Sequence, residues 1–324
     1  MDKKKKRVSL LIPVKLDDPK PLSMLLKSLD KFNYFNRKDF EVFVVDDASP
    51  TSEVEEICKR YSVRYLKTKG VGKSAALNLG IKQTDSEFLA FVDQDIVILD
   101  DKWLDILMSD FSDEKTVYVS GKVVAYETSS EASKRWEKKG ALNKGSKRLE
   151  IGQKFFKKFQ FKGVQVQLFS VGTNYVIRNK VLKEIGGYDE RFGPGGLIGG
   201  AGADLDIGYK VLRNGYQAVY DPRAVIAHQH PTSMFDLRSK LFTYGISDTA
   251  IHTKFWVEFG DIRGFFQIFY RTFQNFGRMI RGFLGLYPLP PRVIWESIRG
   301  NIVGPVKYFS LCYPIWSNKK VKRQ

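Results

Sequence analysis

Apolar and polar positions follow two different periods along the first hundred residues of the chain. Runs of mostly apolar residues predict buried strands over residues 8–14, 41–46, 63–66 and 88–92. Between these runs, apolar residues recur every three or four positions and predict helices over residues 22–29, 54–61 and 75–81. Strands and helices that alternate in this way are typical of an α/β fold with a mainly parallel sheet.

Two later stretches differ in composition from this pattern. Residues 127–162 contain 11 Lys or Arg against 4 Glu, with aromatic residues between them, and we expect them to be helical and partly exposed. The same α/β character returns over residues 164–220. Residues 236–324 then hold 18 of the 44 aromatic residues and 14 Lys or Arg against 5 acids. The prolines within 288–291 should divide this last stretch into two helical pieces.

These changes in pattern predict the domain organisation. We expect one α/β domain over residues 1–235, built from a first half at 1–122 and a second half at 123–235. A basic, aromatic-rich helical extension should follow over residues 236–324. The boundary rests on the composition shift near residue 235, because no linker rich in Gly or Ser marks it.

Composition narrows the possible classes of protein. A chain of 324 residues with 43% hydrophobic residues can bury a large core, which excludes a disordered chain. Its 53 Lys or Arg against 36 Asp or Glu give a net charge of +17 and predict an anionic partner. Cys58 and Cys312 are far apart, which argues against a disulfide framework and fits a reducing cytoplasm. Windows without charge, such as 308–318, are too short for a membrane span, which needs about 18 residues.

Acidic pairs follow two of the predicted strands. Asp46 and Asp47 end the strand at 41–46, and Asp93 and Asp95 follow the strand at 88–92. Strand ends in open α/β sheets carry ligand-binding groups, and carboxylates two residues apart suit Mg²⁺ or Mn²⁺ on a phosphate. Either pair by itself could equally cap the helix that follows it.

A glycine-containing segment at residues 69–74 offers a rival interpretation. It resembles the phosphate-binding loop of nucleoside triphosphatases, and an apolar strand ending in Asp93 follows it. The full loop pattern needs glycine at position 67, where this chain has Lys67. A nucleoside triphosphatase therefore stays only as a minor alternative.

A third acidic cluster follows the glycines at 199–202. Asp204 and Asp206 begin a segment with helical periodicity there. A flexible loop that leads into an acid can place a general base beside a substrate hydroxyl. The alternative is that Asp204 is an N-cap and Asp206 a first-turn acid of an ordinary helix.

Taken in order, these segments resemble a known family, the inverting family 2 glycosyltransferases with the GT-A fold. The resemblance covers residues 8–228 and is carried by VSLLIPV, VVDDAS, GKSAALNLGI, FVDQDIVIL, VGTNYVIRNKVLKEIGGYDERFG and GADLDIGYKVLRNGYQAVYDPRAVIAH. Each motif is weak by itself, but their order and spacing make the match specific.

The resemblance implies a role for each matching residue. The nucleotide sugar would be bound by Pro13, Asp46, Asp47, Lys73 and Asp93. A Mn²⁺ or Mg²⁺ cofactor would be held by Asp95, with His228 as a second ligand or, as readily, a structural histidine. Asp204 matches the catalytic base, although Ala203 replaces the Glu that usually precedes it. Asn174 and Asp206 would lie on the acceptor side, and a turn role is an equal alternative for Asn174.

We therefore expect an enzyme that transfers a single sugar, with inversion, from a UDP-, GDP- or dTDP-sugar to a hydroxyl of a glycan or lipid-linked acceptor. Processive synthesis is disfavoured, because the segment at 267–272 lacks the Q-x-x-R-W spacing and its Trp. The main alternative is a basic membrane- or nucleic-acid-binding protein built on an inactive scaffold. Nucleic acid fits less well, because the basic and aromatic residues interleave along helices and not on a sheet face.

The residue pattern of the C-terminal extension predicts the location of the protein in the cell. Helical spacing puts most of the rings at 265–276 on one face, near basic residues such as Arg271 and Arg281. We expect this region to dock on an anionic membrane without spanning it, or else to pack on the catalytic domain or on a second subunit. The expected location is the cytoplasmic face of the cell membrane, as a peripheral protein.

Overall fold

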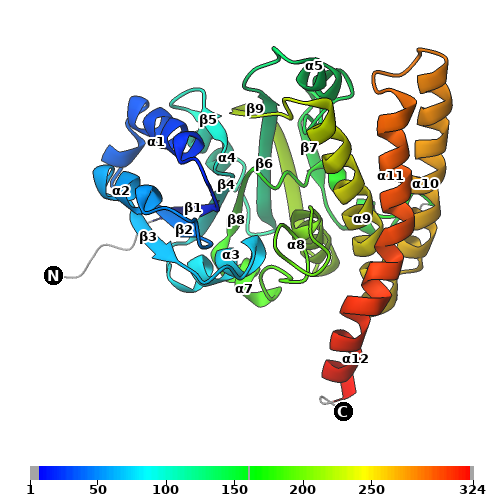
Figure 1. The fold of residues 1–324 in the computed structure, drawn as a ribbon. Coiled ribbons are helices and arrows are strands. Elements are labelled where there is room, and N and C mark those ends of the chain that lie inside the picture. The colour runs from blue at the N-terminus through cyan, green and yellow to red at the C-terminus, as the bar shows by residue number, and fades with distance from the viewer. Residues whose placement is uncertain (1–6, 160, 322–324) are drawn as a thin grey trace.

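The computed structural model describes residues 7–159 and 161–321, which form a mixed α/β domain with helices along one side (Figure 1). Its nine described strands lie in one sheet, with the order β3-β2-β1-β4-β8-β6-β9-β5 and with β7 paired to β9. The strands are β1 Val8–Val14, β2 Phe40–Asp46, β3 Arg64–Lys67, β4 Phe88–Val92, β5 Ile96–Ile98, β6 Thr116–Ala125, β7 Leu149–Ile151, β8 Asn174–Arg178 and β9 Gln217–His228.

Helices connect these strands and cover both faces of the sheet. Those of the α/β part are α1 Lys20–Lys31, α2 Glu53–Arg60, α3 Lys73–Lys82, α4 Trp103–Ser109, α5 Glu131–Lys138, α6 Gln153–Lys157, α7 Asn179–Glu184 and α8 Ala203–Arg213. The last part of the chain forms α9 Met234–Phe259, α10 Ile262–Phe283, α11 Pro291–Lys307 and α12 Tyr313–Val321, with a π-helical turn at Tyr308–Cys312 between the last two. None of the helices in the described part of the chain is long and apolar enough to cross a membrane.

The first four strands confirm the predicted parallel arrangement. β3, β2, β1 and β4 run parallel, so that Asp46 at the end of β2 and Asp93 after β4 lie at the same edge of the sheet. β8 is antiparallel to both β4 and β6, and β5 is antiparallel to β9. The sheet is therefore parallel where the nucleotide motifs lie and mixed beyond them.

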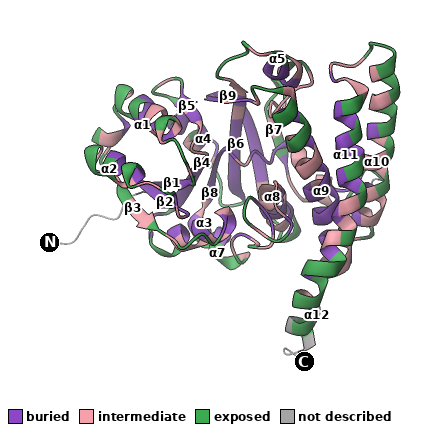
Figure 2. Ribbon diagram, in the orientation of Figure 1, coloured by how far each residue is buried: buried purple, intermediate pink, exposed green. Residues whose placement is uncertain are grey.

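Successive strand residues enter two separate buried layers, because side chains alternate between the faces of a sheet. Leu10 and Ile12 of β1 join the layer under α1, α2 and α4, whereas Leu11 joins the layer that contains residues of α3, α7 and α8. The second layer also includes Ile251 and Phe255 of α9. Buried residues of α9 therefore share the core of the sheet (Figure 2), as do Tyr308 and Cys312 of the π-helical turn.

The prediction for residues 127–162 was only partly correct. The structure has two short helices there, α5 and α6, separated by a loop and the strand β7. β7 forms because Leu149–Ile151 pairs with the beginning of β9, with Ile151 opposite Ala218. Pairing with a distant strand has overridden the local helical composition.

The prediction of two helical pieces after residue 235 also needs correction. The prolines do separate α10 from α11, and Pro291 begins α11. An earlier break divides the first piece, because Gly260 ends α9 with φ of 67° and Asp261 caps α10 through a bond from the Arg263 amide. Glycine reaches this left-handed conformation without a steric penalty, and the chain folds back there.

α9 and α11 pack with their backbones in close contact. A Cβ atom on Gly300 of α11 would lie 2.9 Å from the Cα atom of Gly245 in α9, and it would overlap the carbonyl oxygen of Phe242. Gly304 meets α9 equally closely, at Ile246 and Thr249. Glycine at these positions lets the two helices approach each other.

This contact predicts that Gly300→Ala destabilises the protein. We expect the free energy of unfolding to fall by about 1–3 kcal/mol, because the methyl group forces α9 and α11 apart. Gly277→Ala is the matched control, since nothing lies within 4 Å of the position of its Cβ in the middle of α10. That change should be neutral or should stabilise by up to about 1 kcal/mol, as alanine favours helix. Equal effects of both variants in urea unfolding would contradict the close-contact interpretation.

Candidate active site

Two acids and a histidine converge where β4 and β9 end. Asp93, Asp95 and His228 each offer one ligand atom, and the three atoms lie within 4.8 Å of one another. His228 reaches this position because it pairs with Ile96, the residue after Asp95, in the antiparallel β5–β9 ladder. Its Nε2 lies 3.6 Å from Asp95 Oδ1. Two carboxylates and an imidazole form a donor set that suits a divalent cation such as Mn²⁺.

Lys73 lies beside this group at the first position of α3. Its ammonium donates a hydrogen bond to Asp93 Oδ1, and its backbone amide donates to the Pro194 carbonyl at 2.9 Å. Burial by itself lowers the pKa of Lys73, but the ion pair with Asp93 and the charges of Asp95 and Asp204 outweigh it and raise that pKa. Lys73 is therefore a fixed cation at the edge of the group.

Asp204 lies at the start of α8 and lines the same cavity, which has a volume of about 680 Å³. Gly172 leaves room for it, because a Cβ there would lie 3.2 Å from the Asp204 carboxyl carbon. Burial raises the pKa of Asp204, and the charges of Lys144 and Lys73 partly offset that effect. A carboxylate with a raised pKa is a stronger base than one in water.

The rest of the cavity lining comes from segments that the sequence motifs did not single out. α9 contributes Tyr244 and Asp248, and α10 contributes Arg271 and Arg278. The loop after α5 adds Lys139 and Lys144. The surplus of basic residues in both regions was visible in the sequence, but their composition gave no sign of which side chains face inward.

Asp46 and Asp47 are buried and already bonded within the domain. Asp46 accepts from the Ser49 amide at 2.8 Å and from the Tyr65 hydroxyl at 2.6 Å. Asp47 accepts from the Thr68 hydroxyl at 2.5 Å and from the backbone amides of Val71 and Gly72 at 2.7 and 2.9 Å. Neither acid lines the cavity, and neither does Pro13, which is buried in β1.

The bonds of Asp47 also weaken the phosphate-loop interpretation of residues 69–74. Such a loop binds phosphate through free backbone N–H groups. Here the amides of Val71 and Gly72 are occupied by a carboxylate, which is itself negatively charged. The loop instead serves to orient Lys73 at the start of α3.

Asn174 lies inside the sheet and not on the cavity surface. Its Oδ1 accepts from the Trp103 indole N–H at 2.8 Å, and its Nδ2 donates to the carbonyls of Lys122 and Ala224 at 3.0 and 3.1 Å. The side chain is fully buried, at the first position of β8. These three bonds join α4, β6 and β9 around the start of β8.

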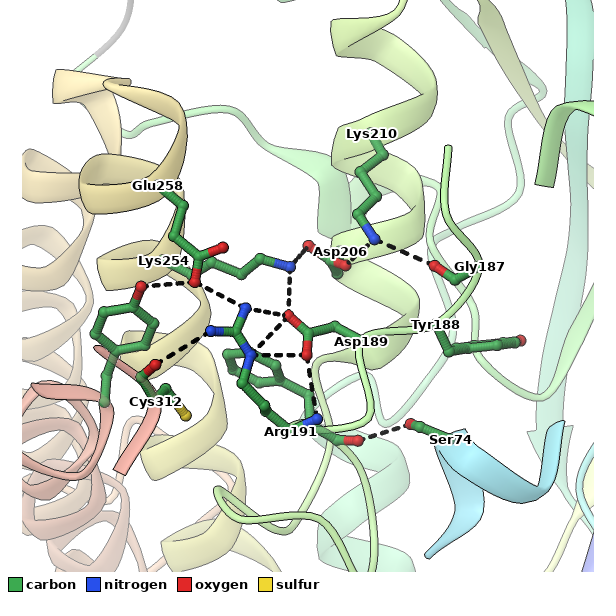
Figure 3. Close-up of polar contacts among 12 residues, drawn as sticks. Ser74, Gly187, Tyr188, Asp189, Arg191, Asp206, Lys210, Lys254, Glu258 and Cys312 are labelled. Carbon is green, nitrogen blue, oxygen red and sulfur yellow. Dashed lines mark hydrogen bonds and ion pairs between the residues drawn. The ribbon is translucent and has the colours of Figure 1, made fainter. Parts of the chain in front are cut away.

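Asp206 is also buried, at the centre of an ion-pair network (Figure 3). It contacts Lys254 of α9 at 2.5 Å and Lys210 at 2.7 Å. Lys254 also contacts Asp189 at 2.7 Å, and Arg191 joins Asp189 to Glu258 at 2.5 and 2.7 Å. Burial alone would raise the pKa of Asp189, but bonds and charges from Arg191 and Lys254 hold that pKa well below its usual range.

The two remaining histidines do not belong to the group of Asp93, Asp95 and His228. His230 lies 3.3 Å from Glu137, and burial together with the charge of His228 lowers its pKa to about 4. His252 lies 3.4 Å from Asp248, and burial lowers its pKa as well. Both imidazoles are buried.

Comparison with known proteins finds glycosyltransferases in each case. The family model described as "Glycosyl transferase family 2" matches residues 9–186. "Pre-mycofactocin glycosyltransferase" of Mycobacterium tuberculosis is 25% identical over 241 residues, which are 74% of this chain and 46% of that protein. "Probable glycosyltransferase YdaM" of Bacillus subtilis is 22% identical over 285 residues, 83% of this chain and 62% of that protein. The chain thus spans about half to two thirds of the length of these relatives.

One solved structure shares the fold along nearly the whole chain. It is the mannosyltransferase PcManGT from Pyrobaculum calidifontis, in complex with GDP-Man and Mn²⁺. The match covers 95% of this chain and 88% of that one, with 15% sequence identity and a TM-score of 0.59. The likeness extends to the expected fold class, a GT-A α/β domain with a C-terminal helical part.

Proposed function

Because this chain belongs to glycosyl transferase family 2, we propose that it transfers a single sugar, with inversion and with the help of a divalent metal ion. The donor is a nucleoside diphosphate sugar, and the acceptor is a hydroxyl of a glycan or of a lipid-linked molecule. One observation supports this most: Asp204 lines the same cavity as the Lys73–Asp93 pair and His228. A base, a diphosphate site and a metal site are the parts that such a reaction needs.

On the donor side, Asp93, Asp95 and His228 would hold the metal ion, with Mn²⁺ or Mg²⁺ as the candidates. When bound, such an ion neutralises the negative charge that develops on the departing diphosphate. The cation of Lys73 is suited to contact the same diphosphate. GDP-Man and Mn²⁺ in the mannosyltransferase of the same fold are consistent with this arrangement, although the nucleotide of this chain is open among UDP, GDP and dTDP.

On the acceptor side, Asp204 would remove the proton of the attacking hydroxyl. The acceptor oxygen then forms its bond to the anomeric carbon as the bond from that carbon to the diphosphate oxygen breaks. The burial that raises the pKa of Asp204 strengthens it as a base, while the charges of Lys144 and Lys73 favour its ionised form. A single displacement of this kind inverts the anomeric centre.

The C-terminal helices are suited to an anionic membrane surface. A stripe on α10 exposes large apolar side chains in helical register: Phe269, Phe273, Ile280 and Phe283 are between 50% and 73% exposed. Arg281 is exposed on the same helix, and further exposed apolar residues follow on α11 and α12 (Figure 2). Phe266 differs, because it packs against Phe159 and Phe161 of the α/β part. The protein is then peripheral, and we propose the cytoplasmic face of the membrane as its location.

The base assignment predicts that Asp204→Asn lowers kcat by about 100-fold or more, while the affinity for the nucleoside diphosphate stays nearly unchanged. Activity is measured as metal-dependent turnover of the sugar nucleotide. A thermal unfolding curve of each variant measures its stability. Asp206→Asn is the comparison, and it should mainly lower the melting temperature because it leaves Lys254 with less compensating charge. A stable but inactive Asp206→Asn beside an active Asp204→Asn would refute the assignment.

The metal assignment predicts a nucleotide effect that depends on the cation. In a thermal-shift screen of UDP, GDP and dTDP, the matching nucleotide at 100 times its Kd should add about 2.7 kcal/mol of stability with Mn²⁺ or Mg²⁺. EDTA should abolish the shift, and so should Asp95→Asn. Asp101→Asn is the control. It changes an exposed acid nearby in the sequence and should retain the nucleotide-dependent shift. A full shift for Asp95→Asn in EDTA would remove the metal from the mechanism.

The exposed apolar stripe on α10 predicts salt-sensitive binding to vesicles that contain anionic lipid. Changing Phe273 and Phe283 together to serine should weaken co-sedimentation by about tenfold or more, because each ring buries considerable apolar area in the interface. Leu99→Ser removes an apolar side chain that is 43% exposed, next to β5 and far from α10, and should change nothing (Figure 1). A wild-type protein that stays in the supernatant at low salt would instead favour a protein partner for this surface.

A further inference from the structure

One wall of the active-site cavity is basic, and the family motifs do not account for it. Lys139 and Lys144 come from the loop after α5, and Arg271 and Arg278 come from α10, seven residues apart on one helix face. We call these four residues the basic wall. They are drawn together from two regions that are more than a hundred residues apart in the sequence.

The protein neutralises little of this charge. Arg271 contacts Asp248 at 3.0 Å. Within residues 7–159 and 161–321, Lys139, Lys144 and Arg278 have no ion-pair partner. Lys139 lies over the Trp136 ring at 4.2 Å, and Arg278 donates to the Asn275 side chain at 2.9 Å.

The cations of the basic wall also repel one another. Burial lowers the pKa of Lys139 to about 7, with further contributions from the charges of Arg278, Lys144, Lys240 and Arg271. Burial lowers the pKa of Lys144 too; the charge of Asp204 opposes this shift and the charge of Arg271 adds to it. Partly buried cations without counter-charges are costly to hold together, and such arrangements concentrate at sites that bind an opposite charge.

The bound donor by itself does not balance the positive charge of the basic wall. A divalent cation and Lys73 together carry three positive charges, against four negative charges on Asp93, Asp95 and a sugar-linked diphosphate, so the donor side keeps a net charge of −1. Lys73 is already tied to Asp93. With the donor and its metal ion in place, the four cations of the basic wall still exceed the single negative charge left on the donor side together with the carboxylates of Asp204 and Asp248.

We propose that the basic wall binds a phosphate group of the acceptor and thereby holds the acceptor hydroxyl near Asp204. This inference rests on the proposed transferase function. Two guanidinium groups and two ammonium groups suit a phosphate, because Arg binds it in a bidentate manner and Lys adds charge without demanding a fixed geometry. The phosphate could belong to a lipid carrier or to a phosphate-containing glycan, and both present the same chemistry to the wall.

The test asks whether the cavity holds two anions at once. The full-length protein is saturated with Mg²⁺ and the nucleoside diphosphate that the screen selects, and inorganic phosphate is then titrated in a thermal-shift assay. Wild-type protein should gain a second, saturable increment in melting temperature. Lys139→Gln and Arg278→Gln should each weaken phosphate binding by about tenfold or more, as expected for loss of a charge-assisted bond. Arg281→Gln removes an exposed cation three residues further along α10 and should retain the full increment.

Each outcome has a distinct meaning. Phosphate that only competes with the nucleotide, or variants that weaken nucleotide binding as much as phosphate binding, would assign the basic wall to the donor and overturn the proposal. An increment that is equal in wild-type protein and both variants would overturn it as well, because it would be a general salt effect. If no nucleotide binds but phosphate still does so through Lys139 and Arg278, the proposed donor chemistry fails while the anion site stands.

A second arm distinguishes the two sources of the phosphate. Dodecyl phosphate and glycerol 3-phosphate are compared under the same conditions, with dodecyl maltoside as the uncharged amphiphile. A lipid carrier predicts tighter binding of dodecyl phosphate, and a phosphate-containing glycan predicts that glycerol 3-phosphate binds at least as well. Either result supports the phosphate site, provided that both ligands lose affinity in Arg278→Gln. Equal binding of dodecyl maltoside in wild-type protein and that variant would show an apolar site and contradict the proposal.

Discussion

A buried lysine of the C-terminal part connects the helices to the α/β domain. Lys254 of α9 is 2% exposed and lies between Asp206 of α8 and Asp189 of the preceding loop. A charge this deep is tolerated only when its partners are fixed in place, since removal of one partner leaves the other uncompensated. α9 therefore has one position relative to α8, and α8 is the helix that begins beside Asp204.

This constraint determines what encloses the active site. The sheet supplies Asp93, Asp95 and His228 through strand ends, and the docked helices supply Asp248, Arg271 and Arg278. Asp93 and His228, which suit a metal ion, thus face the same cavity as cations that suit an anion. The raised pKa of Asp204 is a consequence of the same enclosure, because the helices and loops around it remove water from its carboxylate.

α10 has two chemically different faces in this arrangement. Arg271 and Arg278 point to the cavity, whereas Phe269, Phe273, Ile280 and Phe283 are exposed to solvent on the outside. An acceptor that is anchored in a membrane and carries a phosphate would meet both faces of one helix. The membrane surface and the basic wall are separate proposals, but the geometry of α10 makes them compatible with a single acceptor.

Much of the α/β part could be predicted from the sequence by itself. The strands at 8–14, 41–46 and 88–92 lie where the apolar runs predict them, and the acids after them lie at one sheet edge because parallel strands must end together. The order of the motifs was sufficient to identify the family. These features depend on residues close to each other in the chain, so that local periodicity and spacing are enough to reveal them.

Only the tertiary structure decided the partners of individual polar side chains. The sequence left open whether Asp206 and Asn174 bind a ligand or have a structural role, and the structure shows that Lys254 and Trp103, which are distant in sequence, contact their polar atoms. In the same way, β7 exists because β9 offers it an edge, and the cations of residues 139–144 and 271–278 face one cavity because α9 and α11 hold α10 against the domain. The physical reason is that hydrogen bonds and charge pairs form between groups that meet in space, and a sequence pattern reports only the neighbours along the chain.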